Sequence, residues 1–405
     1  MADVHLDTAF QSRQANLRTF LRESGRKALQ AAVDLAIAED CQAVLIAGDL
    51  FDNQNLSFAT EKFLIGEMER LAFKGITVFY APGNHDPVTR LRQINWPTNV
   101  RLFTSREPEI QPLYDQEGEK IALVVGAGHE SPLESENLAA AFPVLKEETL
   151  PVLGLLHTLV LDSGAEKEHL RYAPCTLQDL KEKGYTYWAL GHVHRRNVLS
   201  KEQGIVYPGN LMGRNSRESG LKGGYLVEID KDGRVKMAFC PLAPLVWLKI
   251  IVDNLEGANH LEGLEELIIE KVKKELQPFG KTTFLLDLEL SGPCPLYREL
   301  LQPENQLALA DNLKTELAVH HLEIFVEKIL PPLSVDEYRD EIHVLGEILN
   351  LIAELAVNPE KLLALAPTAV AGLPRQASQQ EKIAYLKSLL VNLDYEVVAR
   401  FVGGE

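Results

Sequence analysis

Short, unbroken apolar runs recur along the first 240 residues, and they predict strands that are buried on both faces of a sheet. The clearest run is Ala43–Ala47, which follows a helix-like amphipathic stretch over residues 17–39. A second helix is expected over residues 59–73. Further strands are predicted at residues 76–80, 120–126, 152–156, 187–190, 198–199, 205–207, 225–229 and 235–239. This order predicts an α/β fold of two packed mixed β-sheets flanked by helices.

The pattern changes after Pro241 and Pro244, which indicate a boundary. Beyond them the order is β-α-β-α-β, with strands expected at 247–252, 282–290 and 322–329 and helices at 261–276 and 307–320. Helical periodicity then dominates residues 335–356, 360–365 and 381–401. The sequence therefore predicts three domains: residues 1–240, a small α/β cap domain at 245–333, and a helical C-terminal region at 334–405.

Charge is unevenly divided between these parts. The chain of 405 residues carries a formal net charge of −17, which by itself disfavours a nucleic-acid partner. Residues 241–405, however, hold 14 basic and 26 acidic side chains, which leaves 27 of the 41 basic and 32 of the 58 acidic side chains for residues 1–240. The strongly acidic part is thus the C-terminal part, and it is not expected to meet phosphate.

Other features of the composition favour a cytoplasmic protein. No apolar run reaches ~18 residues, so no transmembrane helix and no membrane partner are expected. The first residues lack the basic and apolar regions of a signal peptide. The four cysteines, Cys41, Cys175, Cys240 and Cys294, show no paired short spacing, which favours a reducing compartment without disulfides.

Ligand-type side chains follow the predicted strands at five places. Asp3 and His5 open the chain, and the other motifs each close a strand: Gly48-Asp49, Gly83-Asn84-His85-Asp86, His157 and Gly191-His192-Val193-His194. One such motif alone is more often a polar turn or a core histidine, but five at strand ends predict one shared site. Imidazole, carboxylate and amide groups without thiolate suit Mn²⁺, Fe²⁺ or Zn²⁺. Seven ligands fit two metals about 3.5–4 Å apart that share a carboxylate.

The start of the chain raises a question about Asp3 and His5. These residues need a strand to hold them, and only Met1 and Ala2 precede them. We therefore expect the natural chain to begin about five or six residues earlier, with a central strand there. With this start, the first metal site is expected to be poorly held.

The motifs together resemble those of the calcineurin-like metallophosphoesterases, over roughly residues 2–240. Ala2–Asp7, Ala47–Asp52 and Ala189–His194 resemble SbcD-like DNA repair exonuclease subunits, while Tyr172–Cys175 and Tyr207–Arg214 resemble the YhaO-type branch. The resemblance implies the metallophosphoesterase sandwich fold and two divalent ions, with Mn²⁺ preferred. It assigns the first metal to Asp3, His5, Asp49 and His194, and the second to Asp49, Asn84, His157 and His192.

The resemblance also implies in-line attack of hydroxide on phosphorus, with both ions stabilising charge on the phosphoryl oxygens. His85 is then the catalytic histidine, and Asp86 is expected to orient its ring and favour its charged form. Asp52 is interpreted either as a residue that supports the ligands or as a solvated loop acid, with neither favoured.

Arg195 and Arg196 directly follow His194, and Arg214 lies in the loop after Tyr207. If they line the same edge, they are expected to bind the phosphodiester backbone; the alternative is a scattered set of surface arginines. The resemblance then implies an exonuclease or endonuclease acting on DNA ends without sequence specificity. It also implies a partner ATPase of the SbcC-like SMC type, contacted by the C-terminal helices, and is compatible with a homodimer. Two alternatives remain open: a phosphatase or phosphodiesterase for small molecules, and a non-catalytic structural subunit of a DNA-tethering complex.

Overall fold

The structure is a computed structural model, and it describes residues 1–10, 14–52, 56–91, 94–146, 148–161, 163–164, 172–333, 335–339, 343–365 and 378–403. By its internal contacts the chain divides into two compact units. The first comprises Met1–Leu248 and Lys281–Leu285, and the second comprises Lys249–Gly280 and Leu286–Glu405. Within the described ranges, no helix is both long and apolar enough to cross a membrane. The finer division of the second unit at residue 334 remains a prediction.

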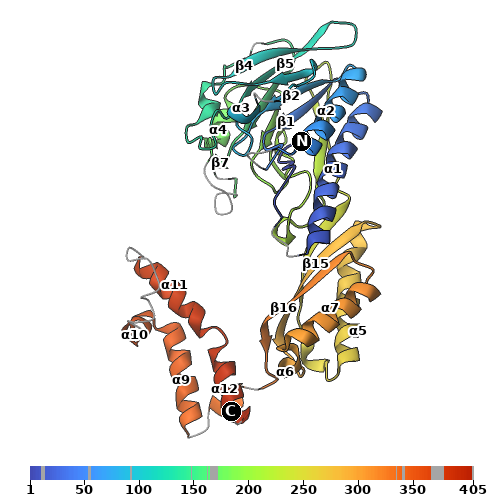
Figure 1. Ribbon diagram of the computed structural model, residues 1–405. Helices are drawn as coiled ribbons and strands as arrows, with labels where there is room; N and C mark the ends of the chain where they lie inside the picture. The colour runs from blue at the N-terminus through green and yellow to red at the C-terminus, as the bar shows by residue number, and fades with distance from the viewer. Residues whose placement is uncertain are drawn as a thin grey trace. The chain divides into compact units, whose positions relative to one another are not determined.

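Two sheets form the centre of the first unit (Figure 1). The smaller sheet is entirely parallel, with the order β1 (Ala43–Ala47), β2 (Thr77–Ala81), β3 (Val100–Leu102). The larger sheet is mixed and has the order β10-β11-β9-β6-β5-β4. Its strands are β4 (Glu109–Tyr114), β5 (Lys120–Ala127), β6 (Val152–His157), β9 (Tyr187–Gly191), β10 (Asn197–Ser200) and β11 (Ile205–Tyr207). The two packed sheets are confirmed, but only the larger one is mixed.

Alternating side chains of the strands decide which layers pack together. On one face of the small sheet, Val78 and Tyr80 pack under α1 (Ala15–Ala38) and α2 (Phe58–Phe73). On its other face, Phe79 and Ala81 pack against the large sheet. The far face of the large sheet is covered by the 3-10 helix η1 (Leu138–Ala141) and α4 (Leu177–Lys181). Both sheets are therefore covered on both faces, as the unbroken apolar runs predicted.

Shorter elements complete the first unit. They are α3 (Val88–Leu91), the pair β7 (Val160–Leu161) and β8 (Cys175–Thr176), the 3-10 helix η2 (Ser216–Glu218), and the antiparallel hairpin β12 (Gly223–Ile229) and β13 (Val235–Pro241). Strands β3 and β4 were not predicted. Their half-exposed residues give no continuous apolar run, so the pattern that revealed the central strands was missing.

Most of a three-stranded sheet of order β14-β15-β16 belongs to the second unit, and the first residues of β14 and β15 belong to the first. The strands are β14 (Leu245–Val252), β15 (Thr283–Pro293) and β16 (His321–Leu330). The helices of the second unit are α5 (Leu261–Leu276), α6 (Tyr297–Leu300) and α7 (Pro303–Glu316), with η3 (Leu255–Gly257) and η4 (Gln277–Phe279) between elements. The predicted alternation of strands and helices is confirmed.

In the helical part of this unit, two of the predicted helices are each divided into two. Predicted helix 335–356 appears as α8 (Val335–Arg339) and α9 (Val344–Val357), and predicted helix 381–401 as α11 (Gln379–Leu390) and α12 (Leu393–Gly403). Asn392 between the last two has a positive φ of 63°, which a continuous helix does not accept. Helix α10 (Pro359–Leu365) completes the set.

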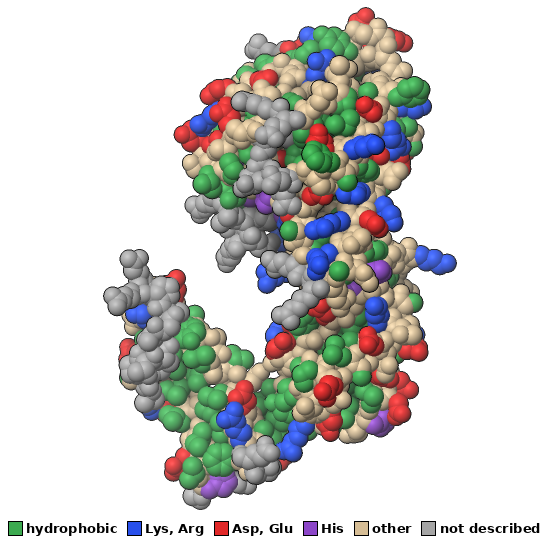
Figure 2. All heavy atoms as spheres, in the orientation of Figure 1, with side chains coloured by type: hydrophobic (Ala, Val, Ile, Leu, Met, Phe, Trp, Pro, Cys, Tyr) green, Lys and Arg blue, Asp and Glu red, His purple; other side chains and the backbone are tan. Residues whose placement is uncertain are grey.

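Helices α8, α9 and α12 share a small core made by Val335, Leu345, Leu349 and Val398. Many other apolar side chains from residue 344 onward stay exposed, and Figure 2 shows apolar surface gathered on this part of the chain. They are Val344, Leu351, Val357, Tyr385, Leu389, Val391 and Phe401.

Candidate metal centre and catalytic site

The C-terminal ends of four strands deliver the predicted ligands to one edge of the two sheets. Strand β1 ends before Asp49, β2 before Asn84, β6 at His157 and β9 before His192 and His194. Parallel pairing of β1 with β2 and of β6 with β9 puts these ends side by side. Ligand-type residues on that edge therefore converge from distant parts of the sequence, as expected of an α/β site.

Asp3 and His5 are held against β1 and the loop that follows it. The N–H of Asp3 donates to the carbonyl of Gly48 at 3.1 Å, and the N–H of His5 donates to the carbonyl of Asp49 at 2.9 Å. Leu6 forms a parallel bridge with Phe51 in the same loop, and Ala2 forms one with Asn210 of a later segment. The expectation that these two residues would be poorly held is therefore wrong, because their own backbone provides the strand-like pairing.

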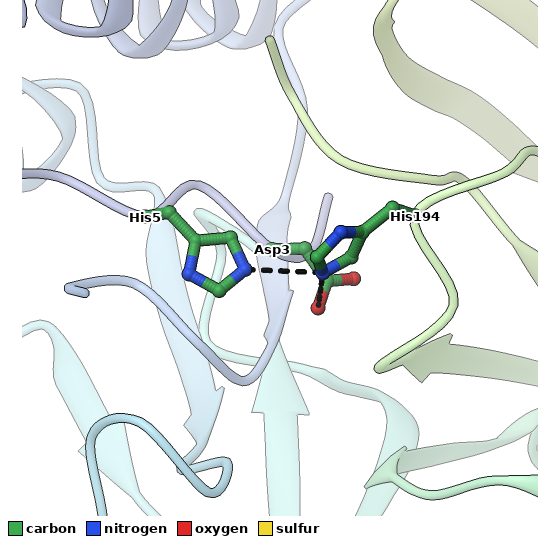
Figure 3. Close-up of side chains that lie close together, drawn as sticks. All are labelled: Asp3, His5 and His194. Atoms are coloured by element: carbon green, nitrogen blue, oxygen red, sulfur yellow. Dashed lines mark hydrogen bonds and ion pairs between the residues drawn. The ribbon is translucent and has the colours of Figure 1, made fainter. Parts of the chain in front are cut away.

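The first cluster consists of Asp3, His5 and His194 (Figure 3). The Nε2 atoms of the two histidines lie 3.2 Å apart, and Nε2 of His194 lies 3.7 Å from Oδ1 of Asp3. Nε2 of His5 is also 3.9 Å from Oδ2 of Asp49. Three of the four ligands expected for the first metal thus gather around one point, and Asp49 borders it.

The second cluster forms around His157 and Asp49. The ring of His157 donates from Nδ1 to the carbonyl of Ala47 at 3.0 Å, so its Nε2 carries the lone pair. That Nε2 lies 3.0 Å from Oδ1 of Asn84 and 3.4 Å from Oδ2 of Asp49. Asp49 therefore belongs to the second cluster and borders the first, and its bridging of two metals remains a prediction.

His192 joins the site through its ring and its backbone. The ring packs edge-on against His157 with centroids 5.3 Å apart, and the main-chain N–H donates to both carboxylate oxygens of Asp3 at 3.1 Å. Its assignment as a ligand of the second metal remains a prediction.

The charges of the site fit divalent cations. Asp3 and Asp49 are 1% and 2% exposed, and burial followed by their mutual repulsion raises the pKa of Asp3 well above its ordinary value. Burial likewise raises the pKa of Asp49. Burial also lowers the pKa values of His5 and His157, which keeps both rings neutral, as metal ligands must be. Two close buried carboxylates facing neutral imidazoles are costly unless a cation lies among them.

Backbone strain is concentrated at the same residues. Asp3, His5, Asp49 and His192 have φ values of 50°, 50°, 52° and 99°, in a region that residues with a side chain rarely adopt. Each such residue costs about 1–3 kcal/mol, and the conformation persists only where the surroundings impose it. Four strained residues among seven predicted ligands indicate that the backbone is shaped for the site.

Two glycines allow the motifs to approach one another closely. A Cβ atom at Gly83 would collide with the Asp49 carboxylate, and a Cβ atom at Gly191 would collide with the carbonyl of Ala47. The predicted role of these glycines, to let the backbone pass close to the metals, agrees with this crowding.

Asp52, and not Asp86, is the carboxylate that pairs with the catalytic-histidine candidate. Oδ1 of Asp52 lies 2.8 Å from Nδ1 of His85 and 3.3 Å from Nδ1 of His5. The hydrogen bond that the His85 ring donates to Asp52 is the main cause that raises the pKa of His85, against the opposing effect of burial. The ring of His85 is 41% exposed, so a substrate can reach it. The spacing Gly48-Asp49-x-x-Asp52 carried the signal for this residue.

Asp86 has a structural position instead. It is fully buried, and its carboxylate accepts from the N–H groups of Gly83 at 2.7 Å and Asp49 at 3.1 Å, and also from the N–H of Leu50 and the hydroxyl of Tyr80. Burial, followed by the Asp49 carboxylate, raises its pKa to about 6. The prediction that Asp86 orients His85 is wrong, because its oxygens bind the turn that carries Asp49.

The three arginines expected to bind substrate lie in different surroundings. Arg195 is exposed next to His194. The guanidinium of Arg196 lies over the ring of Phe239, 4.1 Å from its centroid. Arg214 is inside the site, where it contacts Glu218 at 2.9 Å and Asp52 at 3.6 Å. A substrate contact stays a prediction for all three.

Sequence reasoning missed several supporting residues. Glu218 lies 2.8 Å from Nδ1 of His194, and Lys222 donates from Nζ to the carbonyl of His194 at 2.9 Å. Burial alone would raise the pKa of Glu218, but His194 and Arg214 lower it below its ordinary value. His129 is fully buried and pairs through Nε2 with the carbonyl of His157 at 2.8 Å. Glu218 and Lys222 belong to no strand-end motif, so only the folded structure could reveal them, whereas His129 follows strand β5 by two residues and carried that signal in the sequence.

A two-layer sheet core that gathers carboxylates, imidazoles and an amide at one edge is an arrangement that suits a two-metal site, as in metal-dependent phosphoesterases. Comparison with known proteins agrees: residues 1–196 match the family model described as calcineurin-like phosphoesterase. The chain belongs to this family, which uses a dinuclear metal site.

Individual relatives are similar over longer stretches. The uncharacterized metallophosphoesterase YhaO of Bacillus subtilis (strain 168) is 35% identical over 284 residues, which cover 68% of each chain. The DNA double-strand break repair protein Mre11 of Sulfolobus acidocaldarius is 25% identical over 334 residues, covering 80% of this chain and 81% of that protein. A subunit of the nuclease SbcCD of Rhodobacter capsulatus is 26% identical over 243 residues, covering 49% of this chain and 58% of that protein.

Proposed function

We propose that this protein is a dinuclear-metal phosphodiesterase that hydrolyses DNA phosphodiester bonds during DNA repair, with Mn²⁺ as its preferred metal. The observation that carries the proposal is the junction of two ligand clusters at Asp49, beside a half-exposed histidine that is paired with Asp52. The ligand clusters would hold the metals that bind and polarise a phosphoryl group, and His85 would exchange a proton. Both are needed to cleave a phosphodiester.

The residues of the chain divide the chemistry between them. When bound, two divalent ions supply Lewis-acid stabilisation of phosphoryl charge and a water nucleophile of lowered pKa. His85 contacts the phosphate or protonates the leaving oxygen, and Asp52 orients its ring and favours its charged form. Asp86 holds the Asp49 turn in place by accepting hydrogen bonds from the main-chain N–H groups of Asp49 and Gly83.

DNA as the substrate is supported by the names of two relatives, a DNA double-strand break repair protein and a nuclease subunit. The first 240 residues also carry far less excess acid than the rest of the chain. Arg195, exposed next to His194, offers a contact to the backbone phosphates. Contacts of this kind position DNA without reading its sequence, so we propose action at DNA ends regardless of sequence.

We further propose that an SMC-type ATPase of the SbcC kind binds the C-terminal helices. The exposed apolar side chains of α9, α11 and α12 support this, because a partner helix can bury them. A homodimer is compatible with this arrangement. The four free cysteines suit a reducing cytoplasmic setting.

The test uses the 405-residue protein loaded with Mn²⁺ after removal of all metal by a chelator. Linear duplex DNA labelled at one end is compared with p-nitrophenyl phosphate and bis-p-nitrophenyl phosphate, and the Asp49→Ala variant serves as the metal-deficient control. We expect cleavage of DNA and of the diester by the wild type and neither by the variant. Cleavage of the small esters alone would favour the small-molecule enzyme instead.

A wild-type protein that binds two Mn²⁺ ions and cleaves none of the three substrates would favour the non-catalytic alternative. The main reason for that alternative was the lack of support for Asp3 and His5, and their backbone pairing with β1 and its loop weakens it.

A further inference from the structure

The segment from Asn210 to Lys222 contacts His194 and Asp3, two members of the first cluster. The N–H of Asn210 donates to the carbonyl of His194 at 3.2 Å, and Nζ of Lys222 donates to the same carbonyl at 2.9 Å. The N–H of Leu211 donates to the carbonyl of Asp3 at 3.3 Å. This segment therefore touches the backbone of two of the expected ligands of the first metal.

Arg214 of this segment reaches the His194 ring, and so does the carboxylate of Glu218. Its Oε1 lies 2.8 Å from Nδ1 of His194, and the side chain is only 12% exposed. Its Oε2 accepts from Nδ2 of Asn210 at 2.7 Å and from the N–H of Arg214 at 2.8 Å. The carboxylate is thus fixed by donors on both oxygens before any metal arrives.

The contact decides which nitrogen of His194 carries the proton. A carboxylate paired with a guanidinium acts as an acceptor, so the ring must donate to it from Nδ1. The lone pair then lies on Nε2, the atom that faces Nε2 of His5 at 3.2 Å. Without Glu218, the neighbouring Arg214 nitrogen, 3.0 Å from Nδ1, can only donate, and it would favour the opposite tautomer.

We infer that Glu218 is a positioning residue that sets the tautomer of His194 and thereby the affinity of the first metal site, while the second site depends on it little. The inference rests on the proposed function only in taking the two clusters as metal sites. Residues that accept a hydrogen bond from the other ring nitrogen of a histidine ligand typically contribute about 10–100-fold to metal affinity.

Arg214 extends this arrangement toward the catalytic histidine. Its guanidinium bonds Glu218 and also lies 3.6 Å from Oδ2 of Asp52, the partner of His85. Its side chain is 20% exposed, which suits a group that ties two carboxylates together. Arg214 thus links the support of the first metal to the support of His85.

The experiment measures Mn²⁺ binding by isothermal titration calorimetry and by electron paramagnetic resonance, on metal-free wild type, Glu218→Ala and Glu218→Gln. The matched control is Glu202→Gln, an exposed acid with no contact to the clusters among the described residues. For Glu218→Ala we expect one site to weaken about 10–100-fold while the other keeps its affinity, with an isolated-ion spectrum replacing the spin-coupled one. Glu218→Gln keeps an acceptor oxygen and is expected to recover part of the loss, and Glu202→Gln is expected to match the wild type.

Two tight sites in Glu218→Ala would overturn the inference, and so would an equal loss at both sites in the folded Glu218→Gln variant. The readout is metal binding, not cleavage. A wild-type protein that binds two ions but leaves DNA intact would therefore refute the proposed nuclease function and leave this inference standing.

Discussion

Replacing Asp86 by alanine should destabilise the protein rather than disable its catalytic histidine. The carboxylate is fully buried and accepts from the N–H groups of Asp49, Leu50 and Gly83 and from the Tyr80 hydroxyl. Each buried donor left without an acceptor costs about 1–3 kcal/mol, so even the lower figure gives about 4 kcal/mol for the four. For a domain of this size, about 2–4 °C of Tm accompanies each kcal/mol, which predicts a drop of about 8–16 °C.

The assay is thermal unfolding of metal-free protein followed by circular dichroism. Asp86→Asn keeps the size and one acceptor oxygen, so a smaller drop is expected from it. Asp232→Ala, which removes an exposed carboxylate, should leave the Tm unchanged. If Asp86→Ala kept the wild-type Tm but lost diesterase activity, the structural role of Asp86 would be refuted and its role toward His85 restored.

Four further predictions concern the same site. Asp49→Ala should remove both metal ions, because this carboxylate borders both clusters, and metal analysis showing one ion retained would contradict the bridging position. His85→Ala should keep both ions and lose about 10²–10⁴-fold in kcat. Asp52→Asn should lower the pKa of His85 and so move the alkaline limb of the pH–rate profile to lower pH. An alkaline limb that does not move would argue against the Asp52–His85 pair. Folding raises the pKa of Asp86 to about 6, so the folded state holds the proton more tightly than the unfolded state. The free energy of unfolding should therefore fall as the pH rises from about 4 to about 6. Urea unfolding should show this pH dependence in the wild type and a weaker one in Asp86→Asn.

The central layers were predictable because their signals are local. Runs such as Ala43–Ala47 are apolar at every position, and that happens only where both faces of a strand are covered. Helix α5 follows from a 3.6-residue apolar period that ends where predicted. Strand β4 could not be found this way, because half of its residues face solvent and its pairing with β5 depends on a neighbour across the sheet.

The C-terminal helices also show what periodicity cannot predict. Periodicity predicted helices over residues 335–356 and 381–401, but it could not place the breaks within them. The second break depends on the left-handed backbone at Asn392, a conformation that asparagine tolerates without requiring it.

For the site, the residue types that follow the strands along the chain were enough to predict a two-metal centre around Asp49. They could not distinguish Asp52 from Asp86 as the partner of His85, since adjacency along the chain favoured Asp86. Folding makes the distinction: the turn after β2 points Asp86 inward to the Asp49 turn, and the loop after β1 brings Asp52 to the ring. Arg214 was predicted as a site residue, but its contacts with Glu218 and Asp52 come only from folding, as does the contact of Glu218 with His194. Hydrogen-bond partners are set by distance in space, while motifs record only distance along the chain.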